Sequence, residues 1–296
     1  MRKKIKRELQ YLFIVLMLGL LQRSPRKCAL LLGALLGRLA FRLIRREREN
    51  VRRGLRVAFG GKKDGREIDG LAQEVFVELG KNVSDVAKLR AMSKGDLWRI
   101  VRPEGFEHLD RALAKGRGVI VIAGHLGNWE LLAAYLASRG YPLNVVGRRL
   151  HDPRLDQALV RLRERWGVRN IARGRDTRDV LRALRRGEMV GLLIDQDTKV
   201  SGVFVDFFGR AAYTPVGPAV LATKLGAPVI STVIHRARDG THRVQVGAEI
   251  DLSLTGNVDQ DLRTNTERCS KVLERHIRQH PAQWVWMHDR WKTKPS

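Results

Sequence analysis

A short apolar stretch followed by a polar loop constrains the fold of this chain more than any other feature. Residues 119–122 (VIVI) are all β-branched and follow the glycine-containing sequence KGRG. Such a run is typical of a strand covered on both faces, which is usually parallel and central. Ala-Gly at 123–124 allows a tight turn, and residues 129–136 (WELLAAYL) have helix-forming composition. His125 is therefore expected in a strand-to-helix loop, at the sheet edge where α/β folds bind ligands.

The rest of the chain alternates between patterns typical of strands and of helices. Strands are predicted at 142–147, 189–194, 228–234 and 242–250, and helices at 153–166, 177–186 and 258–279. This alternation predicts an α/β fold with a mainly parallel sheet flanked by helices. We expect one α/β domain over residues 28–296, preceded by a basic and apolar segment at 1–27.

His125 and Glu130 form a candidate catalytic pair. An imidazole titrates near neutrality and can take a proton from a hydroxyl. A carboxylate on its second ring nitrogen fixes the tautomer and stabilises the imidazolium. The five-residue spacing allows this contact if His125 lies in the loop and Glu130 in the first helical turn. The alternative is a capped helix start, with Glu130 favouring the helix dipole and His125 a surface residue.

A second polar cluster follows the predicted strand at 189–194. Asp195 and Asp197 would lie at the carboxyl end of that strand, as His125 lies at the end of its own. Two clusters at one edge of a parallel sheet can share a pocket. The alternative is a turn formed by the aspartates.

The chain carries a formal net charge of +25, which favours anionic partners. Arginines crowd residues 148–175, and guanidinium groups bind phosphates at two points, so this stretch predicts a site for an anionic group. These arginines are Arg148, Arg149, Arg154, Arg161, Arg163, Arg165, Arg169, Arg173 and Arg175. A non-catalytic membrane or nucleic-acid binder would show the same charge, but no RNA motif or stacking platform is evident, so nucleic acid is not an expected partner. Cys28 and Cys269 lie far apart without a Cys/His cluster, and no metal site is expected.

The N-terminal region predicts attachment to an anionic membrane surface. Basic residues at 2–7 and 22–27 flank an apolar run at 9–21, which is shorter than the roughly 20 residues that cross a bilayer core. A second apolar stretch at 29–44 carries Arg38 and Arg42 one turn apart, which suits a helix lying in the interface. The alternative is a helical hairpin packed on the core. Near the C-terminus, aromatic residues mixed with basic ones also suit a membrane interface, or Trp284 and Trp286 belong to the core. These residues are Trp284, Trp286, Trp291, Arg290, Lys292 and Lys294.

The pattern His-x4-Glu after an apolar strand resembles the HX4D/E motif of the glycerolipid acyltransferase superfamily. HLGNWE at 125–130 is similar to the version in bacterial lipid A biosynthesis (late) acyltransferases of the lauroyl/myristoyl type, and PAQWVWMHDRWKTKP at 281–295 is similar to that family's closing signature. The resemblance implies an α/β fold in which His125 is the general base and Glu130 its partner. Because the negative tetrahedral oxygen requires donors, backbone amides near Gly127 or an arginine are the candidates.

The resemblance also implies a substrate pair and a location. The donor would be acyl carrier protein, an acidic protein, and the acceptor a hydroxyl on a 3-hydroxyacyl chain of a phosphorylated lipid A precursor, in lipopolysaccharide biosynthesis. No cofactor or metal is implied. The catalytic domain would lie on the cytoplasmic face of the bacterial inner membrane. The runner-up acceptor is another lipid, such as a lysophospholipid or an ornithine lipid, since the His/Glu machinery does not identify the alcohol.

Further site residues follow from the same resemblance. The family's functional arginine is best matched by Arg163 or Arg165, and its second acidic residue by Asp195. Thr214 opens a loop (TPVGP) that resembles the family's loop before a helix. The expected substrate-binding residues are Asn128, Arg148, Arg149, Arg163, Arg165, Asp195 and Thr214.

Overall fold

A seven-stranded sheet forms the centre of the protein in a computed structural model that describes residues 2–172 and 177–295. Its strand order is β1-β9-β8-β2-β5-β3-β4. The strands are β1 (Val101–Glu104), β2 (Val119–Ala123), β3 (Leu143–Gly147), β4 (Arg169–Ala172), β5 (Met189–Leu193), β8 (Val229–Arg236) and β9 (His242–Glu249). Within the described ranges, β8 and β9 pair antiparallel and the other neighbouring strands pair parallel. The predicted mainly parallel sheet with a central strand at 119–122 is confirmed.

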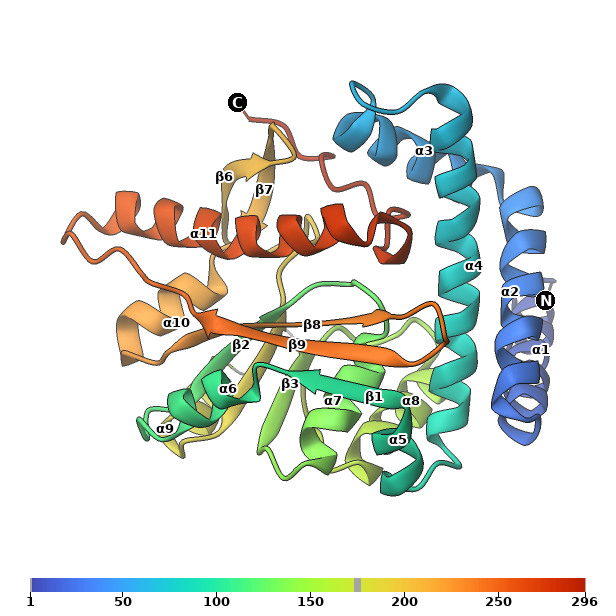
Figure 1. Ribbon diagram of the computed structural model, residues 1–296, viewed down its shortest axis with the longest axis horizontal. Coiled ribbons are helices and arrows are strands. Elements are labelled where there is room, and N and C mark those ends of the chain that lie inside the picture. Colours follow the sequence, from blue (N-terminus) through green and yellow to red (C-terminus); the bar gives the residue numbers. More distant parts are fainter. Residues whose placement is uncertain (1, 173–176, 296) are drawn as a thin grey trace.

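Helices cover both faces of the sheet (Figure 1). One layer consists of α5 (Lys94–Ile100), α6 (Phe106–Leu113), α7 (Trp129–Ser138) and α8 (Pro153–Arg165). The other consists of α9 (Thr177–Arg185), α10 (Gly217–Leu225) and α11 (Val258–Gln279). In β2, Val119 and Val121 join the core of the first layer, whereas Ile120 and Ile122 join that of the second. Because side chains of a strand alternate between faces, an all-apolar β2 follows from its burial on both sides.

Four N-terminal helices lie before α5 and the first strand of the sheet in the described residues. They are α1 (Arg2–Arg23), α2 (Arg26–Leu43), α3 (Arg45–Phe59) and α4 (Gly65–Leu89). Figure 1 shows α4 running along one side of the sheet, with α2 outside it. The backbones of α2 and α4 approach closely, because a Cβ added to Gly80 would lie 2.0 Å from the carbonyl oxygen of Gly33. Helix α2 is therefore packed into the domain and begins two residues before the predicted boundary at residue 28.

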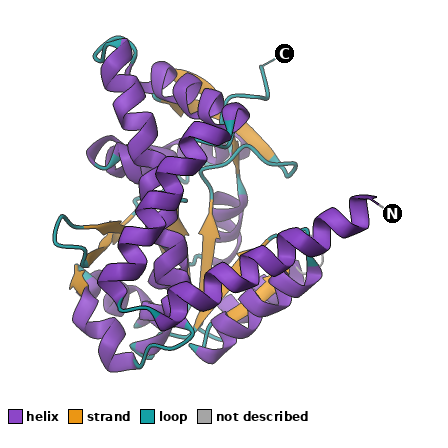
Figure 2. Ribbon diagram, turned by 90° about the vertical axis from the view of Figure 1, so that its right-hand side faces the viewer, coloured by secondary structure: helices purple, strands orange, loops and turns teal. Residues whose placement is uncertain are grey.

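Apolar side chains on the outer faces of α1 and α2 are exposed. None of the helices formed by residues 2–172 and 177–295 combines the length and the apolar composition needed to cross a bilayer. Figure 2 shows α1 extending away from the helices beside it toward the N-terminus. The exposed side chains, which we call the apolar stripe, are Leu9, Leu12, Phe13, Leu16, Leu20, Leu31, Leu35, Leu39 and Leu43.

The C-terminal segment packs against a separate hairpin of β6 (Gly202–Phe207) and β7 (Arg210–Pro215). After the short helix η1 (Pro281–Gln283), Trp284 and Trp286 are buried in the core, Trp284 beside Phe207 and Trp286 beside Phe208. Arg290 is buried too, and it donates to the carbonyl oxygen of Tyr213 at 2.6 Å. The interface interpretation of these residues is therefore wrong, because protein encloses them.

Candidate active site

His125 lies in the loop between β2 and α7, in contact with Asp195. Its Nδ1 is 2.8 Å from Oδ1 of Asp195, and its backbone N–H donates to Oδ2 of the same carboxylate at 2.5 Å. The contact follows from topology, because β2 and β5 are parallel neighbours and both residues follow the carboxyl ends of their strands. The shared edge predicted for these two residues is confirmed.

Asp195 is buried and has a third donor in the C-terminal segment. The indole N–H of Trp284 donates to Oδ2 of Asp195 at 2.6 Å. Burial acts to raise the pKa of Asp195, but the charge of His125 and the hydrogen bonds from His125 and Trp284 outweigh it, so this pKa lies below its ordinary value. The carboxylate therefore stays ionised next to the imidazole. Trp284 was missed as a site residue because nothing in the closing signature tells which way its indole points.

Glu130 contacts Arg163, and this corrects the expected His125–Glu130 contact. Oε1 of Glu130 accepts from Nη2 of Arg163 at 2.6 Å, and Oε2 accepts from Nε at 2.8 Å. Asn170 accepts a further hydrogen bond from Nη1 of Arg163 at 2.6 Å. Glu130 does lie in the first turn of α7, as predicted, but α7 packs against α8, which carries Arg163. Arg163 therefore binds the Glu130 carboxylate, and Asp195 takes the place expected for Glu130 beside the imidazole of His125.

The two candidate arginines of α8 lie in different surroundings. Burial acts to lower the pKa of Arg163, but its hydrogen bond and charge pairing with Glu130 raise the pKa overall. Arg165 is exposed and donates to the carbonyl oxygen of Met92 at 3.3 Å. Arg163 is therefore the arginine joined to the HX4E motif.

Asn128 and Thr214 are enclosed by protein, which corrects their expected substrate contacts. The Asn128 side chain caps α7, since Oδ1 accepts from the backbone N–H of Leu131 at 3.1 Å, and Nδ2 donates to the Asn82 carbonyl at 3.2 Å. Thr214 is fully buried and accepts a hydrogen bond from Nη2 of Arg290 at 2.5 Å. Both side chains hold the scaffold of the site, because their polar atoms already have protein partners.

Arg148 and Arg149 are exposed in the loop that follows β3, at the same sheet edge as His125. Helix α1 lies next to this loop and to the start of α8: Nη2 of Arg7 is 3.2 Å from Nε2 of His151 in the loop, and Nη1 of Arg154 on α8 donates to Glu8 at 2.7 Å. The apolar stripe thus begins beside the edge that carries the candidate site. Arg173 and Arg175 lie outside the described residues.

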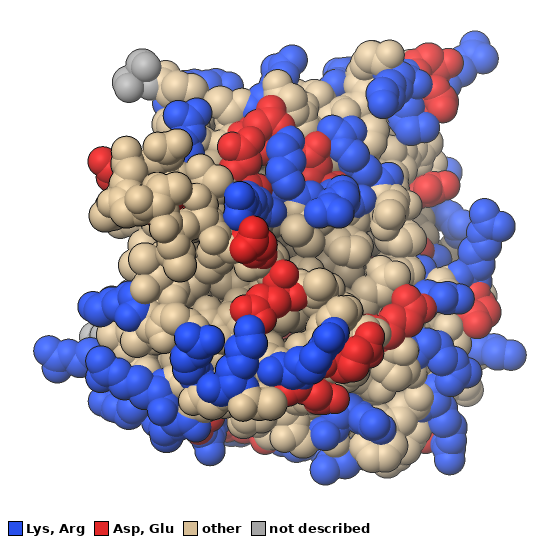
Figure 3. Space-filling model, turned by 60° about the vertical axis from the view of Figure 1, so that its left-hand side comes forward, with Lys and Arg blue, Asp and Glu red and all other residues tan. Residues whose placement is uncertain are grey.

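Basic side chains also cover surfaces away from this edge. Figure 3 shows Lys and Arg across one face of the molecule, dense along its lower rim and mixed with Asp and Glu higher up. Among residues 2–172 and 177–295, no three His, Cys, Asp or Glu side chains are grouped as a metal ion would require.

Comparison with known proteins identifies the family. The family described as bacterial lipid A biosynthesis acyltransferase matches residues 2–293. The chain belongs to this family. It is 26% identical over 287 residues to the lipid A biosynthesis lauroyltransferase of Escherichia coli (strain K12), covering 94% of this chain and 90% of that protein.

Two further relatives carry a different name. The chain is 32% identical over 192 residues to the phosphatidylinositol mannoside acyltransferase of Mycobacterium tuberculosis (strain ATCC 25618 / H37Rv). This match covers 63% of this chain and 58% of that protein. The protein of the same name from Mycolicibacterium smegmatis is 28% identical over 248 residues, or 82% of this chain and 79% of its own length. The match with the M. tuberculosis protein therefore spans less than two thirds of that relative.

Proposed function

We propose that this protein is an O-acyltransferase that moves a fatty acyl group from acyl carrier protein to a hydroxyl of a lipid A precursor. The observation that carries the proposal is the contact of His125 Nδ1 with the buried, ionised Asp195 at 2.8 Å. With Nδ1 engaged there, Nε2 is the nitrogen that takes the proton of the acceptor hydroxyl. Asp195 orients the ring and stabilises the imidazolium. The sequence pattern alone would assign this role to Glu130.

The reaction then proceeds in two steps. The deprotonated hydroxyl oxygen attacks the thioester carbonyl, and a C–O bond forms while the carbonyl oxygen takes up negative charge. The C–S bond breaks next, and the carrier's sulfur leaves with the proton that the imidazolium returns. Arg163 and the backbone amides at the start of α7, after Gly127, are the candidates to stabilise the negative oxygen, since the N–H of Gly127 itself donates to Gln283.

The arrangement of α1 supports a membrane-attached protein on the cytoplasmic face of the bacterial inner membrane. The apolar stripe provides a face that buries in the headgroup region, and Arg148 and Arg149 beside it provide positive charge for lipid phosphates or for the acidic carrier protein. Because Arg7 on α1 contacts His151 in the loop after β3, this attachment brings the lipid surface to the sheet edge of His125.

A second candidate acceptor is a phosphatidylinositol mannoside. The names and the 32% and 28% identities of the mycobacterial relatives favour it. Both acceptors present a hydroxyl on an anionic lipid, so His125, Asp195 and the arginines suit either.

The test is acyl transfer by the purified protein from acyl carrier protein loaded with laurate, myristate or palmitate, to each acceptor in turn. We expect His125→Ala to lower turnover by on the order of 10²-fold or more, the usual scale for losing an acid-base group. His108→Ala is the matched control, because His108 also has its Nδ1 in a polar contact, with Arg111 on α6 at 2.7 Å. Near-normal turnover by His125→Ala overturns the assignment, and the acceptor that is consumed decides between the two lipids.

A further inference from the structure

A buried polar network lies beneath the loop that carries His125. Its member nearest to the loop is Asn82 on α4, whose Nδ2 donates to the carbonyl oxygen of Gly127 at 2.6 Å. Gly127 lies two residues after His125 and has a positive φ of 59°. A Cβ at this position would lie 2.0 Å from the Ile234 carbonyl oxygen, so the loop passes here in close contact with β8.

Gly127 is held at both of its backbone polar groups. Its N–H donates to the carbonyl oxygen of Gln283 at 2.9 Å, while its carbonyl accepts from Asn82. On the other side of the loop, the N–H of Val285 donates to the carbonyl oxygen of His125 at 3.1 Å. The backbone around His125 is thus fixed between α4 and the C-terminal segment.

The orientation of the Asn82 amide is determined by its two partners. Oδ1 of Asn82 accepts from Nη2 of Arg236 at 2.8 Å. A guanidinium can only donate and a carbonyl can only accept, so the oxygen must face Arg236 and the nitrogen must face Gly127. A reversed amide would lose both hydrogen bonds.

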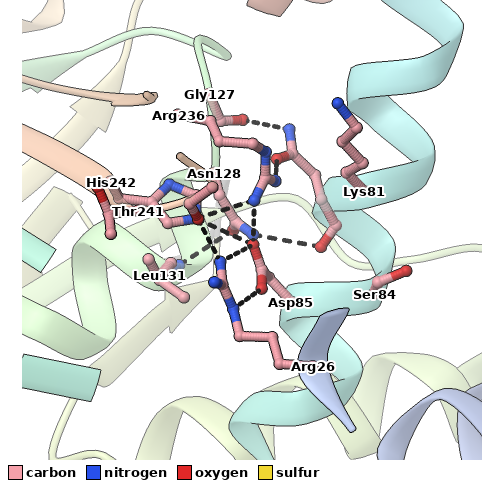
Figure 4. Close-up of polar contacts among 12 residues, drawn as sticks. Arg26, Lys81, Ser84, Asp85, Gly127, Asn128, Leu131, Arg236, Thr241 and His242 are labelled. Carbon is pink, nitrogen blue, oxygen red and sulfur yellow. Dashed lines mark hydrogen bonds and ion pairs between the residues drawn. The ribbon is translucent and has the colours of Figure 1, made fainter. Parts of the chain in front are cut away.

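Arg236 is itself fixed by the buried carboxylate of Asp85 and the partly buried carboxylate of Glu78. Nε donates to Glu78 at 3.0 Å and Nη1 to Asp85 at 2.6 Å. Figure 4 shows Arg26, Arg236 and His242 converging on Asp85. Burial acts to raise the pKa of Asp85, but the hydrogen bond from His242 and the nearby positive charges hold this pKa well below its usual range. Asp85 is therefore ionised at neutral pH, and the network runs from Arg26 on α2 to the loop of His125.

We propose that Asn82 is a positioning residue for acyl transfer, which holds the His125 loop in its working geometry through the Gly127 carbonyl. The inference rests on the proposed function, since it assigns Asn82 to the step that His125 performs. It predicts that loss of this one donor slows the chemical step without weakening substrate binding. A displacement of about 1 Å in an active site costs on the order of 10²-fold in rate.

The substitution Asn82→Asp removes the side-chain N–H that donates to the Gly127 carbonyl. Aspartate has the shape of asparagine and still accepts from Arg236, but it presents an oxygen to the Gly127 carbonyl in place of an N–H. We expect kcat to fall between about 10-fold and 10²-fold, with KM for the acyl carrier protein substrate changed by less than about twofold.

Asn265→Asp is the matched control. Asn265 on α11 is fully buried, donates to the Ser253 carbonyl at 2.9 Å and accepts from the Ser253 N–H at 2.7 Å. The same substitution there removes one donor to a backbone carbonyl at a position outside the candidate site. We expect this variant to keep the wild-type kcat at a similar melting temperature.

The outcomes are distinct. Wild-type kcat in a folded Asn82→Asp protein overturns the inference, as does a fall in kcat that Asn265→Asp matches. If Asn82→Asp does not fold, Asn82→Ser, which adds no charge, replaces it under the same criteria. His125→Ala separates the two proposals: full turnover by that variant refutes the proposed function, whereas an inactive His125→Ala with a fully active Asn82→Asp refutes only the role of Asn82.

Discussion

Glu130 and Arg163 are joined at two points, Oε1 to Nη2 at 2.6 Å and Oε2 to Nε at 2.8 Å. The acidic residue of the HX4E motif therefore ties the first turn of α7 to α8, while the carboxylate on the imidazole comes from the end of β5. The motif thus contributes the base His125 and one partner of a structural ion pair, Glu130. This ion pair holds the guanidinium of Arg163 close to α7.

Neutralising one partner of this pair should destabilise the fold more than neutralising both. The Glu130 and Arg163 side chains are only 10% and 16% exposed, so Arg163→Gln leaves a carboxylate that water reaches poorly. We expect the free energy of unfolding to fall by about 3 kcal/mol in Arg163→Gln and by less in the Glu130→Gln/Arg163→Gln double variant. Urea unfolding of the four proteins measures the coupling. The exposed pair Asp179 and Arg182 is the control, with a coupling of about 0.5 kcal/mol or less. Equal couplings for the two pairs would contradict the prediction.

Trp284→Phe should slow catalysis while the aromatic packing is largely kept. The change removes the 2.6 Å hydrogen bond to Asp195 and leaves a ring among Phe207 and Trp286. Since a hydrogen bond to a charged group is worth about 1.5–3 kcal/mol, we expect turnover to fall by about tenfold or more. Trp98→Phe removes a comparable N–H donor, which binds Ser138 at 3.0 Å outside the site, and should leave turnover unchanged. If the two variants have equal turnover, the Trp284 bond does not support catalysis.

Mild acid should destabilise the protein through His235. Burial, together with the positive charges of His280 and Arg243, lowers the pKa of His235 to about 4, and Glu104 opposes the shift only in part. An unfolded histidine titrates near 6.5, so the unfolded chain binds more protons between these values and stability falls as the pH drops from about 6.5 to 4. His235→Phe keeps a ring against His280, which is stacked at 3.8 Å, and should reduce this pH dependence. Urea unfolding at several pH values between 4 and 7 checks the slope, and equal slopes for the two proteins would exclude His235 as a source.

Charged residues in the apolar stripe should weaken membrane binding. Leu16 is 71% exposed on α1, and Leu254 is 69% exposed in the loop before α11, so the two make a matched pair. Burying a leucine is worth about 1.5–3 kcal/mol, so we expect Leu16→Glu to reduce binding to vesicles of phosphatidylglycerol and phosphatidylcholine by about tenfold or more. Leu254→Glu should bind as the wild type does. Co-sedimentation at low and moderate salt measures the bound fraction, and equal binding of the two variants argues against attachment through α1.

The sequence predicted what depends on local pattern. The apolar run at 119–122 and the alternation after it predicted β2, β3, β5, β8 and β9, whereas β1, β4 and the β6–β7 hairpin were not predicted. The shared carboxyl edge of parallel strands predicted that Asp195 would lie beside His125. The choice between Asp195 and Glu130 depends on the packing of α7 against α8, which turns Glu130 toward Arg163 and which no spacing along the chain encodes. The role of Asn82 could not be predicted from the sequence, because its amide meets Gly127 and Arg236 only after three distant segments have come together.

The hydrogen bond from Trp284 to Asp195 also bears on when the enzyme becomes active during its synthesis. The two residues are 89 positions apart, so a ribosome has released the motif, β5 and Asp195 well before Trp284 emerges. Gln283 and Val285, which hold the backbone of the His125 loop, emerge with it. A nascent chain that stops short of residue 283 therefore carries the base and its carboxylate but lacks the segment that fixes both. Under the proposed function, acyl transfer therefore requires residues 283–285 to have docked, so the site is completed only late in the synthesis of the chain.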